Sequence, residues 1–146
     1  MIKSEKALKR LILDIKPLDE PLEVPFNTLI GLTISSITGG IGDESVIFNT
    51  TQGTSYEMMH HQDWCESVTV EDVCGNLNDL IGNPILIARE DTNSDENPEG
   101  IIAPEYQDSF TWTFYNLATI KGSVTIRWYG DSNGYYSETV EFYRIK

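Results

Sequence analysis

Apolar and polar residues alternate along much of the chain from residue 29 onward, and a period of two predicts β-strands. Turn signals that contain glycine separate the alternating runs, as at Gln52-Gly53. Between Gly75 and Gly82, a short apolar segment instead fits one helical turn at 77–81. In the first two thirds of the chain, strands are predicted at 29–37, 45–50, 54–61, 67–71 and 84–89.

The last third of the chain predicts a three-stranded antiparallel meander with one apolar face. Phe110, Trp112 and Phe114 alternate with polar residues and therefore share one face of a strand. An Asn-Gly pair within 130–134 favours a tight turn, because both residues readily adopt a positive φ. The three strands are predicted at 109–115, 123–128 and 135–143.

The first residues of the chain follow a different pattern, which predicts an amphipathic helix at 4–16. Ser4 can cap this helix, and Pro17 ends it. Four apolar residues recur at helical spacing and form one narrow stripe: Leu8, Leu11, Ile12 and Ile15. The stripe needs a packing partner, which is either the rest of the same chain, the favoured alternative, or a second copy in a homo-oligomer.

These patterns together predict the fold class and the domain organisation. We expect a mainly β protein of the α+β type, with a single antiparallel β-rich domain at 21–146 and an N-terminal helical arm at 1–20. No apolar run approaches the ~20 residues that a membrane span needs. The first ten residues are too charged to begin a signal peptide, so we expect a cytoplasmic protein whose cysteines are thiols.

The net charge of −13 is unevenly distributed along the chain. Residues 1–16 carry five basic and two acidic side chains, whereas residues 17–146 carry five basic and 21 acidic ones. An acidic body repels nucleic-acid phosphates, which argues against general DNA or RNA binding. The charge leaves two functional interpretations, docking on a basic protein surface or binding of a cation, but solubility is the favoured explanation.

The candidate chemistry is concentrated in one short segment, 60–66, which holds both histidines and one of the two cysteines. If this segment is extended, His61, Asp63 and Cys65 share a face and offer nitrogen, oxygen and sulfur ligands to zinc. Cys74 is a candidate for the fourth ligand. Alternatively, a histidine activates Cys65 as a nucleophile while Asp63 orients the imidazole ring.

A structural interpretation of the same segment is favoured over both of these alternatives. In that interpretation 60–66 is a strand end and a turn, and its polar groups satisfy the backbone or one another. Trp64 belongs to the core together with Met58, Met59, Val68 and Val70, and Cys65 and Cys74 are small buried residues. A non-catalytic pocket that uses His60 and Asp63 to bind a ligand is an intermediate possibility.

Two other segments contain side chains that can bind ligands. Asp91, Asn93 and Asp95 match the first positions of a calcium-binding loop, but the glycine and the final glutamate of that motif are missing. We therefore expect 90–100 to be an ordinary solvated loop. The segment 128–137 combines aromatic residues with glycine, serine and asparagine, which suits either a contact surface or a simple hairpin turn.

Several runs of residues resemble a family of small uncharacterised bacteriophage proteins. The resemblance covers roughly 28–143 and is carried by the runs His60 to Val68, Glu71 to Gly82, Trp112 to Tyr115, Thr125 to Gly130 and Ser132 to Ser137. Relatives often have cysteine where Trp64 stands and glutamate where His61 stands. The matching residues in the first run are His60, Asp63, Cys65 and Glu66. The resemblance implies a phage accessory role, including inhibition of a host defence, and no particular activity.

The leading functional hypothesis is a non-catalytic phage accessory protein that acts in the host cytoplasm by binding. It inhibits a host protein with a basic surface, as an acidic mimic of nucleic acid, or it sequesters a small nucleotide-like signal. The candidate ligand-binding residues are His60, Asp63, Cys65, Glu66, Arg127, Tyr135 and Tyr136. The alternatives are an enzyme that uses a metal, zinc above all, or a thiol within 60–66, and a structural phage component. The leading hypothesis requires no cofactor.

Overall fold

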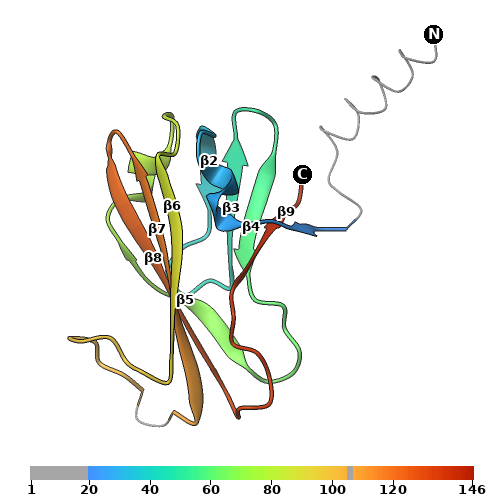
Figure 1. Ribbon diagram of the computed structural model, residues 1–146, viewed down its shortest axis with the longest axis vertical. Coiled ribbons are helices and arrows are strands. Elements are labelled where there is room, and N and C mark those ends of the chain that lie inside the picture. Colours follow the sequence, from blue (N-terminus) through green and yellow to red (C-terminus); the bar gives the residue numbers. More distant parts are fainter. Residues whose placement is uncertain (1–19, 105–106) are drawn as a thin grey trace.

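The structure, a computed structural model, describes residues 20–104 and 107–146 and shows two antiparallel β-sheets packed face to face (Figure 1). The five-stranded sheet has the order β1 (Leu22–Glu23), β9 (Glu141–Arg144), β4 (Ser55–Met59), β3 (Ser45–Thr50) and β2 (Ile34–Thr38). The four-stranded sheet has the order β5 (Ser67–Cys74), β8 (Gly122–Ser132), β7 (Ser109–Thr119) and β6 (Ile87–Ser94). The mainly β prediction is therefore confirmed.

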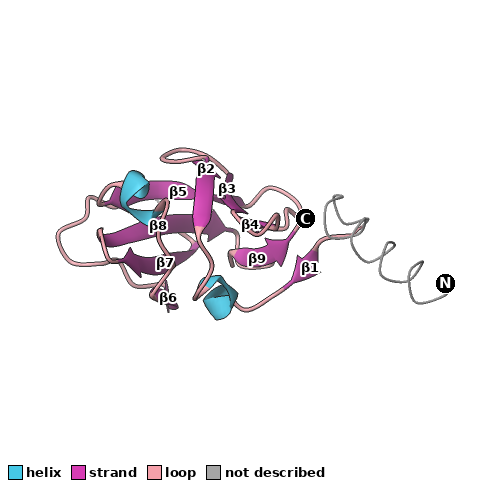
Figure 2. Cartoon of the chain, turned by 90° about the horizontal axis from the view of Figure 1, so that it is seen from above, coloured by secondary structure: helices cyan, strands magenta, loops and turns pink. Residues whose placement is uncertain are grey.

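Two short 3₁₀ helices accompany the sheets: η1 (Phe26–Leu29) and η2 (Leu77–Leu80). Seen from above in Figure 2, η1 lies on the side where β6 and β9 face each other, and η2 lies close to β5 and β8. The described ranges contain no α-helix. The predicted helix at 4–16 and most of the predicted arm at 1–20 lie outside the described residues. No helix in the described part of the chain is both long and apolar enough to span a membrane.

The core lies between the inner faces of the two sheets. Its largest fully buried side chains include Trp128, Tyr115, Phe48 and Met58. The indole Nε1 of Trp128 in the four-stranded sheet donates to the sulfur of Met58 in the five-stranded sheet at 3.3 Å. Close-packed contacts of this kind, together with the apolar area removed from water, hold the two layers together.

Aromatic rings close one side of this core. The ring of Phe142 stacks on Tyr56, with centroids 5.5 Å apart, and meets Phe26 edge to face at 5.2 Å. Phe26 in turn contacts Tyr115 at 4.6 Å, and the Tyr115 hydroxyl donates to the carbonyl of Val140 at 3.2 Å. The Phe26 side chain of η1 thus packs between β9 of one sheet and β7 of the other.

Several predicted elements agree with the structure. β3 occupies the predicted segment 45–50, β4 and β5 overlap the segments predicted for them, and 77–80 forms a single helical turn. The prediction of one strand over 29–37 is wrong in its first half, because η1 ends at Leu29 and β2 begins only at Ile34. The chain turns at Gly31, whose φ of 85° is accessible to glycine but strained for other residues.

The predicted three-stranded meander is wrong, because the third strand belongs to the other sheet. β7 and β8 form the expected antiparallel pair, but β9 crosses over and pairs with β4 and β1. Only Glu141–Arg144 forms this strand, and 133–140 is a connection between the two sheets. Through this crossing, Phe142 becomes part of the core instead of extending the face of the four-stranded sheet.

The prediction that β7 has one apolar face is also wrong, because both of its faces are covered. Tyr115 points into the core, whereas Trp112 points outward and is nevertheless 1% exposed. On this outer face, Tyr129 meets Trp112 edge to face at 4.7 Å. The chain that follows β6 packs over the pair, and Asn97 accepts a hydrogen bond from the Trp112 indole at 3.1 Å. A second, smaller aromatic layer therefore lies outside the sandwich.

The strand register places three connections at the same end of the molecule. Ser67 pairs with Asp131, and Ser109 pairs with Ser132, so β5 and β7 begin where β8 ends. The connections 60–66 and 133–140, together with the described parts 95–104 and 107–108 of a third connection, consequently gather at the lower end in Figure 1. We call this region the loop end.

Candidate functional site

The segment 60–66 is a turn between β4 and β5, as the favoured structural interpretation predicted, and it lacks the extended conformation on which the zinc hypothesis depended. The turn is built around the carboxylate of Glu66. One of its oxygens accepts a hydrogen bond from the backbone N–H of Asp63 at 2.5 Å, and the other accepts one from the N–H of Trp64 at 2.9 Å. The side chain of Gln62 donates to the carbonyl of Glu66 at 2.6 Å. These bonds replace the ladder that a strand would have formed.

The buried ring of His60 pairs with the same carboxylate. Its Nε2 lies 2.8 Å from Oε1 of Glu66, and its Nδ1 lies 2.7 Å from the carbonyl oxygen of Thr139. Only 2% of the His60 side chain and none of the Glu66 side chain is exposed. A carbonyl and an ionised carboxylate can only accept hydrogen bonds, so the ring satisfies both partners when both of its nitrogens carry protons. The geometry therefore defines a buried imidazolium–carboxylate pair.

The protonation equilibria of the two groups agree with this geometry. Burial by itself lowers the pKa of His60, but the hydrogen bonds to Glu66 and Thr139 and the charge of Glu141 raise it, and the resulting pKa lies above its usual value of 6.5. Burial raises the pKa of Glu66, whereas hydrogen bonds from Asp63, His60 and Trp64 lower it to about 2. Both groups are thus charged at mildly acidic pH.

These shifts predict how stability depends on pH. The raised pKa of His60 gives a contribution that is complete below 6.5 and is lost as the pH rises through the folded-state value. The lowered pKa of Glu66 gives a contribution that is complete above 4.5 and is lost as the pH falls toward about 2. We expect the stability difference between wild type and His60→Ala to be largest between these limits. Urea unfolding of both proteins across this range measures it, and a difference that grows above neutral pH contradicts the assignment.

The pair also joins two connections that are distant in sequence. His60 bonds to Thr139, 79 residues away, and the backbone N–H of His61 donates to the carboxylate of Glu141 at 3.0 Å. The turn after β4 is therefore fixed against the connection between β8 and β9. This arrangement matches the structural interpretation of the segment, in which polar groups satisfy the backbone and one another.

The predicted zinc ligands and the predicted thiol–imidazole pair do not come together. Asp63 and Cys65 are exposed on the outside of the turn, and His60 has both nitrogens engaged elsewhere. Within the described ranges, no group of three or more histidine, cysteine or acidic side chains is arranged to hold a metal ion. Cys65 and Cys74 are free thiols, as predicted, but both are exposed, so their predicted burial is wrong.

Trp64 is the clearest difference from the predicted core. Its neighbours Met58, Val68 and Val70 are buried, but Trp64 is 72% exposed. The two N–H groups that bond to Glu66 fix the turn so that the indole is directed away from the sandwich. A large exposed apolar side chain on a fixed turn is typical of a contact surface.

Fluorescence can test this placement, because the other two tryptophans, Trp112 and Trp128, are 1% and 0% exposed. We expect quenching by a soluble quencher to act almost entirely on Trp64 and to disappear in Trp64→Phe. Relative to the free indole of N-acetyltryptophanamide, quenching by caesium should be reduced less than quenching by iodide, since the exposed carboxylates of the loop end attract cations. Stern–Volmer plots measure both effects, and an equal or smaller relative reduction for iodide contradicts the expected negative potential.

Arg127 lies apart from this turn, on the outer face of the four-stranded sheet. Its guanidinium pairs with Glu71 at 2.5 Å and Asp72 at 3.3 Å and lies 5.6 Å from the ring centre of Trp112. Its charge is therefore neutralised by neighbours. The structure does not bring it together with His60 in one pocket, since the Trp128 side chain next to it in sequence points to the opposite face.

The two tyrosines of the predicted set lie at the tip of the connection between β8 and β9. Tyr135 is 88% exposed and Tyr136 is 37% exposed. The tip is ordered by local hydrogen bonds, because Asn133 accepts from the N–H of Tyr135 and the hydroxyl of Ser132 accepts from the N–H of Gly134. The predicted contact surface at 128–137 is thus limited to these exposed residues, since Trp128 is in the core.

The predicted solvated loop at 90–100 is wrong in its first part. β6 extends to Ser94, and Asp91 and Asn93 pair with Phe114 and Trp112 of β7. Alternate residues of one strand project from the same face, and the chain leaves the strand at Asp95, which has a φ of 57°. The oxygen ligands of the calcium hypothesis are therefore spread along a strand instead of converging on a point.

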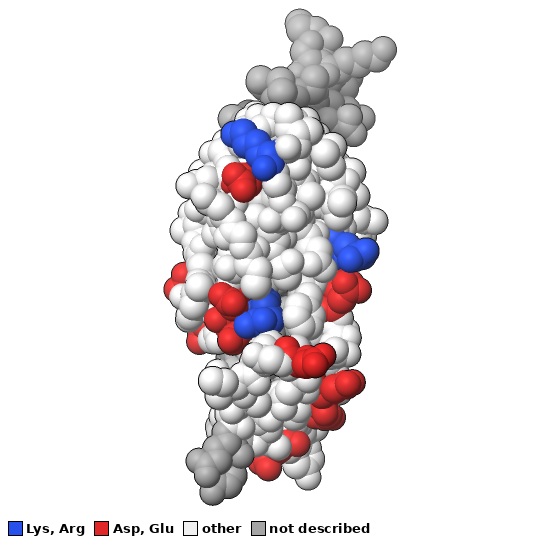
Figure 3. Space-filling model, turned by 90° about the vertical axis from the view of Figure 1, so that its left-hand side faces the viewer, with Lys and Arg blue, Asp and Glu red and all other residues white. Residues whose placement is uncertain are grey.

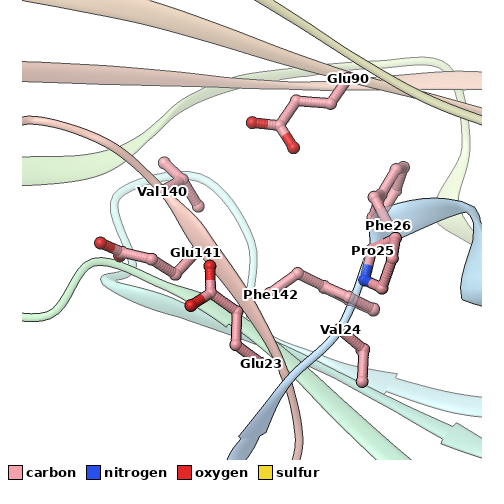
Figure 4. Close-up of a pocket in the computed structure, with 8 residues that line it drawn as sticks. All are labelled: Glu23, Val24, Pro25, Phe26, Glu90, Val140, Glu141 and Phe142. Carbon is pink, nitrogen blue, oxygen red and sulfur yellow. The ribbon is translucent and has the colours of Figure 1, made fainter.

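A cavity of about 430 Å³ opens on the side where β6 faces β9 (Figure 4). Its walls combine apolar side chains with three carboxylates, and Glu90 comes from one sheet while Glu23 and Glu141 come from the other. Burial and the charges of Asp91 and Glu141 raise the pKa of Glu90. The apolar lining consists of Val24, Pro25, Phe26, Val140 and Phe142.

Such a lining suits a cation that is carried on an apolar chain, such as a lysine or arginine side chain, because carboxylates pair with the charge and aromatic faces attract it. Nothing in the sequence pattern indicates this cavity. Its carboxylates belong to β1, β6 and β9, and no motif connects these three strands.

The described chain is thus an antiparallel β-sandwich with an acidic surface and a loop end ordered by a buried ion pair. It belongs to the family described as Domain of unknown function (DUF7448), which matches residues 27–142. Neither a curated protein nor a solved structure matches the chain.

Proposed function

We propose that this protein is a non-catalytic binding protein that recognises a basic surface on another protein. The distribution of charge carries the proposal: the described residues of the loop end include neither a lysine nor an arginine, and they expose the carboxylates of Asp63, Asp95, Glu96, Glu99 and Asp108. An excess of one sign at one end of a molecule steers a partner of the opposite sign and fixes its orientation. In keeping with the phage resemblance, the partner is a host protein that normally binds nucleic acid.

The state of His60 supports binding over catalysis. A general base needs a nitrogen that is free to accept a proton, and both nitrogens of His60 are engaged with acceptors at 2.7 and 2.8 Å. Cys65 is exposed on the outside of the same turn and is not paired with the ring. The residues that suggested an enzyme thus build the loop end instead.

The cavity in Figure 4 supports the protein partner over a small nucleotide-like signal. An anionic phosphate placed there would be repelled by the carboxylates of Glu23, Glu90 and Glu141. A lysine or arginine side chain from a basic protein would instead find opposite charges and an apolar wall. The carboxylates of the loop end then take the place of nucleic-acid phosphates against the partner.

The test is retention of host proteins from a nuclease-treated bacterial lysate on the immobilised protein. We expect basic nucleic-acid-binding proteins to be retained, to elute as the salt concentration rises, and to be displaced by added DNA. An unrelated protein of similar net charge serves as the control surface. A charge-reversed variant, Asp95→Lys/Glu96→Lys/Glu99→Lys, should lose the retained proteins. Recovery of the same proteins on the control surface, or of no protein at all, contradicts the proposal.

A further inference from the structure

We infer that the contact with such a basic partner is made by the loop end, through an aromatic patch formed by Trp64, Tyr135 and Tyr136. This inference rests on the proposed function and deepens it by naming the surface and the chemistry of its complement. The partner is a protein surface on which lysine or arginine side chains surround an apolar recess. The loop end exposes carboxylates, such as those of Asp63 and Glu99, together with these aromatic side chains, so a basic and apolar surface complements it.

The three aromatic side chains lie on two connections that contact each other. Trp64 belongs to the turn after β4, and the tyrosines belong to the connection between β8 and β9. The His60–Thr139 hydrogen bond, at 2.7 Å, joins these two connections directly, and the His61–Glu141 bond, at 3.0 Å, fixes the turn to the first residue of β9. At the same end, the connection after β6 adds Ile102, which is 99% exposed.

The exposure of these side chains leaves their apolar surface uncovered by the rest of the described chain. Trp64 and Tyr135 are 72% and 88% exposed although each adjoins buried residues of the same segment, Glu66 and Glu138. Tryptophan and tyrosine contribute large contact areas at a small cost in side-chain entropy, and they dominate the binding energy of many protein interfaces. Exposed aromatic side chains on two turns that are joined to each other therefore suit a protein-binding surface.

The turns that carry the patch are ordered before any partner binds. The Glu66 carboxylate fixes one turn through two backbone N–H groups. Glu138 is buried next to the other turn, where Thr111 donates to one of its oxygens at 3.0 Å and Ser132 donates to the other at 2.5 Å. A surface that is already in its bound conformation does not lose ordering entropy on association.

The negative charge of the loop end indicates that the partner surface is basic. On the face shown in Figure 3, the lower part, toward the loop end, displays acidic side chains and no basic ones. The five described basic residues lie elsewhere: Arg89, Lys121, Arg127, Arg144 and Lys146. Arg127 is already neutralised by Glu71 and Asp72. A partner with lysine or arginine around its apolar recess pairs with the carboxylates of the loop end, whereas an acidic or purely apolar partner does not.

Selection from a random linear peptide library tests the inference without knowledge of the natural partner. We expect the selected peptides to be enriched in lysine and arginine interspersed with apolar residues. Their affinity should fall at least about tenfold for Trp64→Ser/Tyr135→Ser, because aromatic side chains at the centre of an interface carry most of its energy. The matched control is Leu86→Ser/Ile120→Ser, which removes two exposed apolar side chains near the opposite end and should bind the peptides like wild type.

Hydrogen exchange of the wild-type protein with a selected peptide gives a second readout that does not depend on any variant. We expect slower exchange at 62–66 and 133–137. Cationic peptides that bind wild type and both variants equally, without protection of these segments, would overturn the assigned surface and leave the proposed function standing. Selected peptides without an excess of lysine and arginine would overturn both.

Discussion

Replacing His60 with alanine is expected to lower the free energy of unfolding by about 3 kcal/mol, since removal of one partner strongly destabilises a buried ion pair. The change removes the two hydrogen bonds to Glu66 and Thr139 and leaves the Thr139 carbonyl without its donor. It thereby removes the direct hydrogen bond between the turn after β4 and the connection before β9. Urea unfolding monitored by circular dichroism measures the loss.

The neighbouring histidine provides the matched control for this prediction. The side chain of His61 is exposed, and only its backbone N–H bonds to Glu141, so His61→Ala should change stability by less than about 0.5 kcal/mol. Equal losses for the two variants would show that His60 is not paired as described. A double-mutant cycle of His60→Ala with Glu66→Ala should reveal strong coupling, because the two residues share one interaction.

Trp128→Ala is expected to cost about 3–5 kcal/mol, the range found when a large aromatic side chain is removed from a packed core. Trp128 is fully buried, and its indole joins the two sheets through the sulfur of Met58. The variant should therefore unfold at a much lower urea concentration, with a cooperative transition if the sheets still pack.

The same tryptophan-to-alanine substitution at an exposed position is the matched control, because it removes the same atoms without opening a cavity in the core. Trp64→Ala removes a side chain that is 72% exposed and should alter the free energy of unfolding by no more than about 0.5 kcal/mol. If Trp64→Ala destabilises the protein as much as Trp128→Ala, the turn after β4 contributes to the core and the proposed contact surface is wrong. Thermal unfolding of both variants decides between these outcomes.

Local pattern was sufficient to predict strands with one buried face and one open face. Val46 and Phe48 of β3 are buried between less buried neighbours, and this alternation is visible in the sequence. The alternation of apolar and polar residues does not show which sheet a strand joins. The sequence of β9 would look the same in either sheet, and only the structure shows that it pairs with β4. The pattern also failed for β7, where Trp112 is covered by the chain around Asn97. Such coverage depends on tertiary contacts that periodicity does not encode.

The candidate site shows the same division between local and distant information. The sequence directed attention to His60 and Glu66, and the structure pairs them. Their state depends on Thr139, which is 79 residues away in the chain, so the sequence could not distinguish a ligand-binding histidine from one that fastens two connections. Exposure of Trp64 was likewise unpredictable, because it results from hydrogen bonds between backbone N–H groups and one carboxylate.

The position of β6 at the border of its sheet has a consequence for the behaviour of concentrated solutions. A border strand offers unpaired backbone groups to which another chain can add a strand. Here three consecutive charged side chains, Arg89, Glu90 and Asp91, occupy that strand. A second copy that added a strand along it would take these charged groups partly out of water, and this cost opposes fibre-like stacking. Replacement of Glu90 and Asp91 with valine should therefore promote aggregation without disturbing the folded chain.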